Sequence, residues 1–132
     1  MTENFNAWMQ SVQSAVEKAL SDLLPSENRF PELLHKAMRF AVLDGGKRIR
    51  PLLVFATGML FGARVPVMAQ AAAAVEMIHA YSLIHDDMPC MDNDVLRRGK
   101  PTVHVQFGEA TALLAGDALQ AQAFIVLSQM DD

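Results

Sequence analysis

Two long apolar stretches, residues 65–84 and 110–127, constrain the fold of this chain more than any other feature of its sequence. Each is long enough to raise the question of a membrane-spanning helix. The polar residues that interrupt them are Gln70, Glu76 and His79 in the first and Asp117, Gln120 and Gln122 in the second. Alanine, which is only weakly lipophilic, dominates both stretches. We therefore expect two buried helices of a soluble protein and no integral membrane segment.

Prolines and glycines divide the rest of the chain into segments of helical length. Apolar residues recur at helical spacing in the first segment, and Pro31, Pro51 and Pro66 each suit the first turn of a helix. Because no segment alternates as a strand does, the sequence predicts an all-α fold of five helices. We expect these helices over residues 4–24, 31–43, 51–61, 66–87 and 107–129, with a polar loop over residues 88–104.

Composition narrows the class of protein further. A chain of 132 residues has room for one domain, and its hydrophobic content of 52% is too high for intrinsic disorder. Cys90 is the one cysteine, so an internal disulfide framework is excluded and a reducing compartment fits. The first ten residues lack the basic and apolar order of a signal peptide, and we expect a cytoplasmic protein.

An acidic run followed by basic residues comes directly after the first apolar stretch. Clustered carboxylates without thiolates or several imidazoles suit a hard cation such as Mg²⁺, which binds through one or two carboxylates while substrate phosphates fill other positions. The bases behind the acids suit the phosphates themselves. A solvated charged loop is the alternative, weakened by the ordered separation of acids and bases. The residues are Asp86, Asp87, Asp92 and Asp94, then Arg97, Arg98 and Lys100.

Asp86 and Asp92 cannot share a metal ion on one continuous helix, since residues six apart point about 240° apart on an ideal helix. Pro89 lies between them and is able to break a helix. Shared metal binding therefore requires the helix to end before Asp92.

A second basic cluster, residues 45–51, follows the second expected helix. Gly45 and Gly46 let the backbone approach a ligand closely, and Lys47 with Arg50 supplies a point charge and a planar fork, as expected for a diphosphate. Basic residues after a helix C-terminus are also favoured by the helix dipole without any ligand, so both interpretations stay open. Since the net charge is −4 and no aromatic residues interleave the bases, we expect no nucleic-acid partner.

His79 precedes Asp86 by seven residues, so on one helix the two point to nearly the same face. Their separation along the axis is about 10 Å, which suits two neighbouring diphosphate sites. Taken alone, a histidine in an apolar helix is more often a hydrogen-bonded core residue.

Other residues receive structural interpretations. Asp117 in an apolar helix needs a polar partner or cleft. We expect hydrogen-bonded structural roles for His35, His85 and His104, and core or loop-anchoring roles for the methionines at positions 38, 59, 68, 77, 88 and 91.

Three motifs together resemble the trans-isoprenyl diphosphate synthase family, and within it the bacterial farnesyl diphosphate synthases. They are Gly-Gly-Lys-Arg-Ile-Arg-Pro (45–51), Glu-Met-Ile-His-Ala-Tyr-Ser-Leu-Ile-His-Asp-Asp (76–87) and Met-Asp-Asn-Asp-Val-Leu-Arg-Arg-Gly-Lys-Pro-Thr (91–102). The match runs without a gap to Gly116-Asp117-Ala118-Leu119. The resemblance implies an antiparallel all-α bundle of the isoprenoid synthase type, of which residues 1–132 form the N-terminal part of a single domain.

The same resemblance implies a reaction and roles. An allylic diphosphate would lose its diphosphate to give a carbocation, isopentenyl diphosphate would attack through its double bond, and a proton would leave. Asp86 and Asp92 would ligate Mg²⁺ on the allylic diphosphate with Asp87 in support, and Arg97 would hold that diphosphate. Isopentenyl diphosphate would be gripped by Lys47, Arg50, His79 and Arg98. Metal ions and fixed cations stabilise the charge that grows on a departing diphosphate.

Product length in this family is set by bulk just upstream of the acidic motif. Tyr81 and Ser82 lie five and four residues before Asp86, about one helical turn away. A tyrosine there favours the C15 product, farnesyl diphosphate. The loop sequence also resembles plant geranylgeranyl diphosphate synthases, so the C20 product is the alternative.

Full members of the family run to about twice this length and carry a second aspartate-rich motif. Asp131-Asp132 lacks the context of that motif. We therefore expect a truncated chain that is inactive alone and that associates, as a homodimer or oligomer, through exposed apolar helix faces. The rival classes are a non-catalytic subunit that binds a partner synthase, and a terpene cyclase, which would not need an isopentenyl diphosphate site at Lys47 and Arg50.

Overall fold

The computed structural model describes residues 2–130, which form six helices and one short hairpin. The all-α class predicted from the sequence is confirmed, while Asp131-Asp132 lies outside the described residues. The elements are α1 (Thr2–Leu23), α2 (Glu32–Val42), α3 (Ile49–Leu60), α4 (Val65–Asp87), β1 (Leu96–Arg97), β2 (Lys100–Pro101), α5 (Val103–Phe107) and α6 (Glu109–Ser128).

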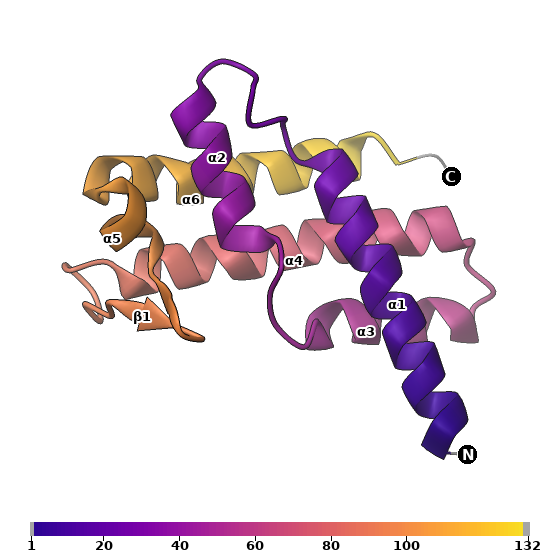
Figure 1. The fold of residues 1–132 in the computed structure, drawn as a ribbon. Helices are drawn as coiled ribbons and strands as arrows, with labels where there is room; N and C mark the ends of the chain where they lie inside the picture. Colours follow the sequence, from indigo (N-terminus) through magenta and orange to yellow (C-terminus); the bar gives the residue numbers. More distant parts are fainter. Residues whose placement is uncertain (1, 131–132) are drawn as a thin grey trace.

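Helix α4 is the central element and contacts each of the other five described helices. It runs antiparallel to α6 along most of its length (Figure 1). Both helices bury alanines, such as Ala73 in α4 and Ala115 in α6, and small side chains let two helices pack at short interaxial distance. A Cβ atom at Gly116 would collide with the ring of His85, so glycine at this position permits the close approach of α6 to the end of α4.

The first helix contributes a buried stripe at the spacing expected from the sequence. Val12, Val16, Leu20 and the following Leu24 are all buried, at most 4% exposed, which places one face of α1 against the core. This helix packs across α3 and α4. Beside that stripe, Gln13 and Glu17 reach the residues just before α3, where they contact Lys47 and Arg48.

Two expectations from the sequence are wrong in detail. Helix α3 begins at Ile49 rather than Pro51, because the first turn of a helix leaves backbone N–H groups unpaired and tolerates proline. The expected polar loop over residues 88–104 contains the β1–β2 hairpin, and the short helix α5 spans the end of that loop, so the last helix begins at Glu109 rather than Phe107. Strands of two residues are too short to show alternation, and the five-residue helix α5 is too short to show helical periodicity, so neither could be predicted from the pattern.

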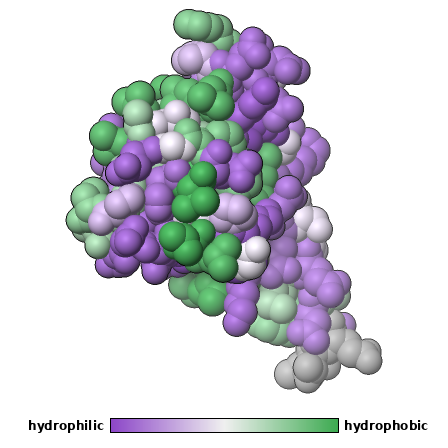
Figure 2. Space-filling view, turned by 60° about the vertical axis from the view of Figure 1, so that its left-hand side comes forward, coloured by the Kyte–Doolittle hydropathy of each residue, from purple (hydrophilic) through white to green (hydrophobic). Residues whose placement is uncertain are grey.

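Helices α4 and α6 are each long and apolar enough to cross a membrane by length and composition, a test that core helices of soluble proteins also pass. Large apolar side chains also reach the surface, among them Leu60, Phe61 and Phe124, each more than 60% exposed. Figure 2 shows such hydrophobic side chains in patches between hydrophilic ones on one face of the molecule.

The methionines divide between the core and the surface. Those at positions 38, 68, 77 and 88 are buried, as expected. Met59 and Met91 are exposed instead, and the sulfur of Met59 accepts a hydrogen bond from the Trp8 indole at 3.2 Å.

Candidate functional site

Residues 44–48, here called the cation turn, connect α2 to α3 through an irregular backbone. Asp44 and Arg48 have positive φ angles of 59° and 58°, a region that costs energy for residues other than glycine. Glu17 of α1 holds both ends of the turn: its carboxylate accepts the Asp44 amide at 2.7 Å and Arg48 Nη2 at 2.8 Å. Gln13 donates to the Lys47 carbonyl at 2.9 Å. Helix α1 therefore fixes the path of the turn.

Arg48 points inward from the turn and is 6% exposed. Besides Glu17, its guanidinium donates to Glu76 of α4 at 3.2 Å and to the Val42 carbonyl at 2.7 Å. Its Nε atom is buried and has no hydrogen-bond partner among the described residues. A buried cation between two carboxylates ties α1, the cation turn and α4 together.

A cavity of about 320 Å³ lies beside the cation turn and is called the cationic cavity below. Its charged and polar lining consists of Lys47, Arg48, Arg50, His79, Arg97 and Arg98, with Glu76 as the one acid among its lining residues. Such an excess of positive charge in a concave site favours anions, and guanidinium groups bind phosphates as planar forks. The structure thus brings together all five residues predicted to contact diphosphates: Lys47, Arg50, His79, Arg97 and Arg98.

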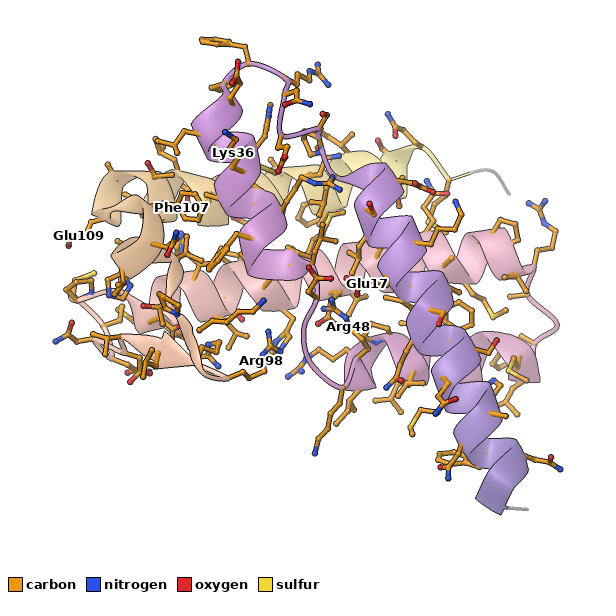
Figure 3. The ribbon with its side chains drawn as sticks, viewed as in Figure 1. Glu17, Lys36, Arg48, Arg98, Phe107 and Glu109 are labelled. Carbon is orange, nitrogen blue, oxygen red and sulfur yellow. The ribbon has the colours of Figure 1, made fainter. Side chains whose placement is uncertain are left out.

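The hairpin delivers Arg98 to this cavity. Arg98 has a φ of 50° and is followed by Gly99 at 77°, so the chain reverses there between β1 and β2. The Arg98 guanidinium lies against the backbone of Gly45 and Gly46, where a Cβ atom on Gly45 would collide with it. Figure 3 shows Arg98 and Arg48 approaching the same space from the hairpin and from the cation turn, with Glu17 above Arg48.

His79 lies on the α4 wall of the cationic cavity. Its Nε2 atom is 3.5 Å from Arg50 Nη1. Burial lowers the pKa of His79 below its ordinary value of 6.5, opposed by the Glu76 carboxylate and reinforced by Arg50, Arg97 and Arg48. This environment therefore favours the neutral imidazole. Ser82 donates to the His79 carbonyl at 2.7 Å and lines, with Arg50 and His79, an adjoining cavity of about 330 Å³.

Asp87 and Arg97 form a two-point ion pair between α4 and the hairpin. Arg97 Nε and Nη2 donate to the two Asp87 oxygens at 2.9 and 2.6 Å. The hydrogen bonds and the charge of Asp87 raise the pKa of Arg97 above its ordinary value. Because Asp87 is 4% exposed and already occupied, it orients Arg97 rather than offering a free carboxylate.

Asp86 and Asp92 belong to a segment, residues 86–94, that consists of the last two residues of α4 and the loop that turns back on the helix end; it is called the acidic loop below. The helix ends at Asp87, and the amides of Asp92 and Asp94 donate to the carbonyls of Asp86 and Asp87 at 2.8 and 3.0 Å. The helix thus ends before Asp92, as shared metal binding requires. Both Asp86 and Asp92 are exposed.

The acidic loop suits Mg²⁺ as part of a site. Within residues 2–130, no three His, Cys, Asp or Glu side chains gather into a metal-binding group. Mg²⁺ binds to proteins through one or two carboxylates, and phosphate oxygens of the substrate fill its other coordination positions. Two exposed carboxylates match this requirement. Asp86 and Asp92 fit such a role.

The remaining histidines have partners that fit their structural interpretation. His35 Nδ1 is 2.8 Å from the Arg29 carbonyl, and His104 Nδ1 is 3.2 Å from Thr102 Oγ1. His85 Nε2 lies 3.0 Å from the Leu113 carbonyl. Asp117 lies 3.7 Å from the same nitrogen, beyond hydrogen-bond distance, and its side chain is 59% exposed, so it reaches solvent and needs no buried partner. Tyr81 packs edge-on against His85, and the centroids of the two rings are 5.3 Å apart.

The sequence pattern did not predict the functional group formed by Arg48, Glu17 and Glu76. Arg48 stands between two residues that face the cavity, so the cluster of bases hid its inward orientation. The available signal was Glu76 itself, an acid within the long apolar stretch of α4, which requires a buried cation as partner.

Comparison with known proteins gives one matching family. The model described as "Polyprenyl synthetase" matches residues 31–132. Among curated proteins, the farnesyl diphosphate synthase of Haemophilus influenzae is 52% identical over 96% of this chain and 43% of its own length. Geranylgeranyl pyrophosphate synthase 4 of Arabidopsis thaliana is 51% identical over 97% of this chain and 34% of its own length.

Solved structures agree with these matches. An apo FPP/GFPP synthase from Zymomonas mobilis superposes with a TM-score of 0.93 at 50% identity, covering 98% of this chain and 46% of that one. Geranyltranstransferase from Thermotoga maritima gives a TM-score of 0.83 at 41% identity, covering 92% of this chain and 45% of that one. The chain spans less than half the length of each of these relatives.

Proposed function

This chain belongs to the polyprenyl synthetase family, and on that premise we propose that it carries the diphosphate-binding part of a trans-prenyltransferase. The observation that carries this proposal is the cationic cavity, in which residues from the cation turn, α4 and the hairpin surround about 320 Å³. We assign residues 1–132 to the N-terminal part of a single isoprenyl diphosphate synthase domain. The reaction is the head-to-tail condensation of isopentenyl diphosphate with an allylic diphosphate.

The residues divide between two diphosphates. Lys47, Arg50, His79 and Arg98 hold isopentenyl diphosphate in the cationic cavity. Arg97 points from the cavity wall toward Asp87 and holds the allylic diphosphate beside the acidic loop. Fixed cations on both sides stabilise diphosphate charge without reorganising during the reaction.

Asp86 and Asp92 would hold Mg²⁺ with the allylic diphosphate, and Asp87 supports them by fixing Arg97. A bound Mg²⁺ supplies Lewis-acid stabilisation of the leaving diphosphate. The aspartates themselves contribute acceptor oxygens from a loop whose backbone is pinned to the end of α4. This chain offers these carboxylates on one side of the site, so we propose that it does not turn over alone.

The product we propose is farnesyl diphosphate, with Tyr81 and Ser82 near the acidic loop setting chain length. The half-buried Tyr81 ring, braced by His85, is the bulk that supports a C15 product. Geranylgeranyl diphosphate is the second candidate, favoured by the similarity to the Arabidopsis protein. We also propose a cytoplasmic location and self-association as a homodimer through the exposed apolar side chains. Sedimentation that shows a compact soluble monomer would contradict the self-association.

Calorimetric titration of the chain with isopentenyl diphosphate tests the function. Lys47→Ala and Arg50→Ala should each weaken binding by roughly tenfold or more, because each removes a charge-assisted hydrogen bond. Lys36→Ala is the matched control, an exposed lysine on α2 away from Arg48 and Arg98 (Figure 3). Unchanged affinity in both cavity variants would reject chain elongation in favour of a cyclase, which does not need this site.

A further inference from the structure

We infer that Arg48 is a positioning residue for diphosphate binding: gripped by Glu17 and Glu76, its guanidinium fixes the cation turn so that Lys47 and Arg50 meet one diphosphate together. This inference rests on the proposed function of the cationic cavity. It assigns Arg48 and the two acids no direct contact with substrate.

The first support is the way in which one carboxylate closes the turn. The two oxygens of Glu17 accept from the Asp44 amide at 2.7 Å and from the Arg48 guanidinium at 2.8 Å. The residues at the two ends of the turn are thereby held by a single side chain of α1. Both ends have positive φ angles, and a strained conformation persists only where its surroundings fix it.

The second support is the hollow space on both sides of the turn. The cationic cavity of about 320 Å³ lies on one side, and a polar cavity of about 560 Å³, lined in part by Gln10, Gln13 and Ser14, lies toward α1. Gly46 and Arg48 line both cavities. Besides the Arg98 guanidinium, which lies against Gly45 and Gly46 on the cavity side, the contacts that hold the turn are the polar ones made by Arg48, Glu17 and Gln13.

The third support is that the guanidinium of Arg48 is already engaged. Its side chain is 5% exposed, and its two terminal nitrogens donate to Glu76, Glu17 and the Val42 carbonyl. Two carboxylates offset its charge, so it adds little attraction for an anion. Lys47 and Arg50, on either side of it in sequence, line the cavity, and the backbone between them passes through Arg48.

The test is Glu17→Gln, measured by titrating the chain with isopentenyl diphosphate. The variant keeps the side-chain shape. Its amide nitrogen is a donor, however, so it cannot accept from one of the two groups that now donate to Glu17, the Asp44 amide and the Arg48 guanidinium. Removing a negative charge near a cationic cavity would by itself tighten anion binding. If Glu17 positions the turn, the affinity for isopentenyl diphosphate should instead fall. We expect about tenfold weaker binding, which corresponds to the loss of roughly one charged hydrogen bond.

Asp22→Asn is the matched control, since it removes the same charge from the same helix at a residue paired with Lys18 on the surface. It should leave the affinity unchanged. A role in stability alone would lower the unfolding temperature of Glu17→Gln without changing the affinity measured well below that temperature. Equal or tighter binding by Glu17→Gln would overturn the inference.

Hydrogen exchange of the amides of residues 44–48 gives a second readout that needs no ligand. Exchange should be faster in Glu17→Gln and in Arg48→Lys, which keeps the charge but loses the fork, and unchanged in Asp22→Asn. Unaltered exchange in the first two variants would also overturn the inference. If the wild-type chain bound no isopentenyl diphosphate, the proposed function would fail, and exchange would still decide whether Arg48 fixes the turn.

Discussion

The cationic cavity and the acidic loop are built in different ways although both are assigned to diphosphate binding. The cation turn beside the cavity is held by buried ion pairs, with Arg48 and Glu76 each 6% exposed. In the acidic loop, Asp86 and Asp92 are exposed, and the loop is held by backbone hydrogen bonds at the end of α4. Among residues 2–130, neither aspartate side chain has a hydrogen bond or ion pair, whereas Asp87 between them is fully paired.

The difference indicates which region is preorganised. Side chains locked by buried partners keep their geometry before a ligand arrives, which lowers the ordering cost of binding. Exposed carboxylates stay hydrated until a cation and a phosphate replace that water. We therefore expect the cavity to bind a diphosphate without metal and the acidic loop to bind one only with Mg²⁺.

The largest expected effect comes from Asp86→Asn combined with Asp92→Asn. Mg²⁺-dependent binding of dimethylallyl diphosphate should be lost, because both carboxylates proposed to hold Mg²⁺ are neutralised. The free energy of unfolding should change by less than about 0.5 kcal/mol, since both side chains lie on the surface. Calorimetry with and without Mg²⁺, with Asp94→Asn as the control, measures this. Mg²⁺-dependent binding that survives in the double variant would contradict the assignment of the acidic loop.

Asp87→Asn should destabilise the fold where its exposed neighbour Asp86→Asn does not. The substitution breaks a two-point charged hydrogen bond to Arg97 at a buried carboxylate, an interaction worth roughly 1.5–3 kcal/mol. Urea unfolding of the two variants side by side measures the difference. Equal stability would show that the two aspartates do not differ in the way described.

Tyr81→Ala should lengthen the product, because it removes the ring that packs against His85 one turn before the acidic loop. The assay needs a complete synthase, obtained by joining residues 1–132 to the remaining part of the Haemophilus influenzae farnesyl diphosphate synthase. Chromatography of the dephosphorylated products should show C20 material beside C15. Ser82→Ala is the control for a small change at the next position. A product spectrum unchanged by Tyr81→Ala would remove the proposed role of this ring.

The smallest effect concerns the pH dependence of stability. Burial lowers the pKa of His79 below the 6.5 of the unfolded chain, so the unfolded state binds more protons between these two values. Stability therefore falls as the pH drops through 6.5 toward the native pKa. His79→Gln should remove that loss, which urea unfolding at pH 7.5 and pH 5.5 detects. An identical pH dependence in both proteins would place His79 in a solvent-like environment.

The helices could be predicted because single prolines and glycines mark their ends and apolar residues recur along them at helical spacing. Pro66 and the apolar run after it indicate α4, and the stripe around Val16 indicates α1. The meeting of Lys47, Arg50 and His79 followed from motif spacing together with the family resemblance. The hairpin at residues 96–101 was missed because two-residue strands carry no periodicity.

The roles of Arg48 and Asp87 were hidden for a different reason. Arg48 follows Lys47 and Asp87 follows Asp86, each a residue of the same charge with a different role. The sequence pattern alone therefore does not show which residue of each pair points inward. That choice depends on partners distant in sequence: Glu17 and Glu76 for Arg48, and Arg97 for Asp87. Glu76 within its apolar stretch signals that α4 needs a buried cation, but the tertiary packing of α1, α4 and the hairpin is needed to show that Arg48 supplies it.

The contact between Arg98 and Gly45 has a consequence for how this sequence can evolve. The guanidinium occupies the volume that a side chain at residue 45 would need, so the two positions are coupled through this contact. An alanine at residue 45 would require the flexible end of the arginine side chain, fifty-three positions downstream, to move from its present place beside the cavity. Paired variation at these two distant sites is the inheritance pattern to look for in this family.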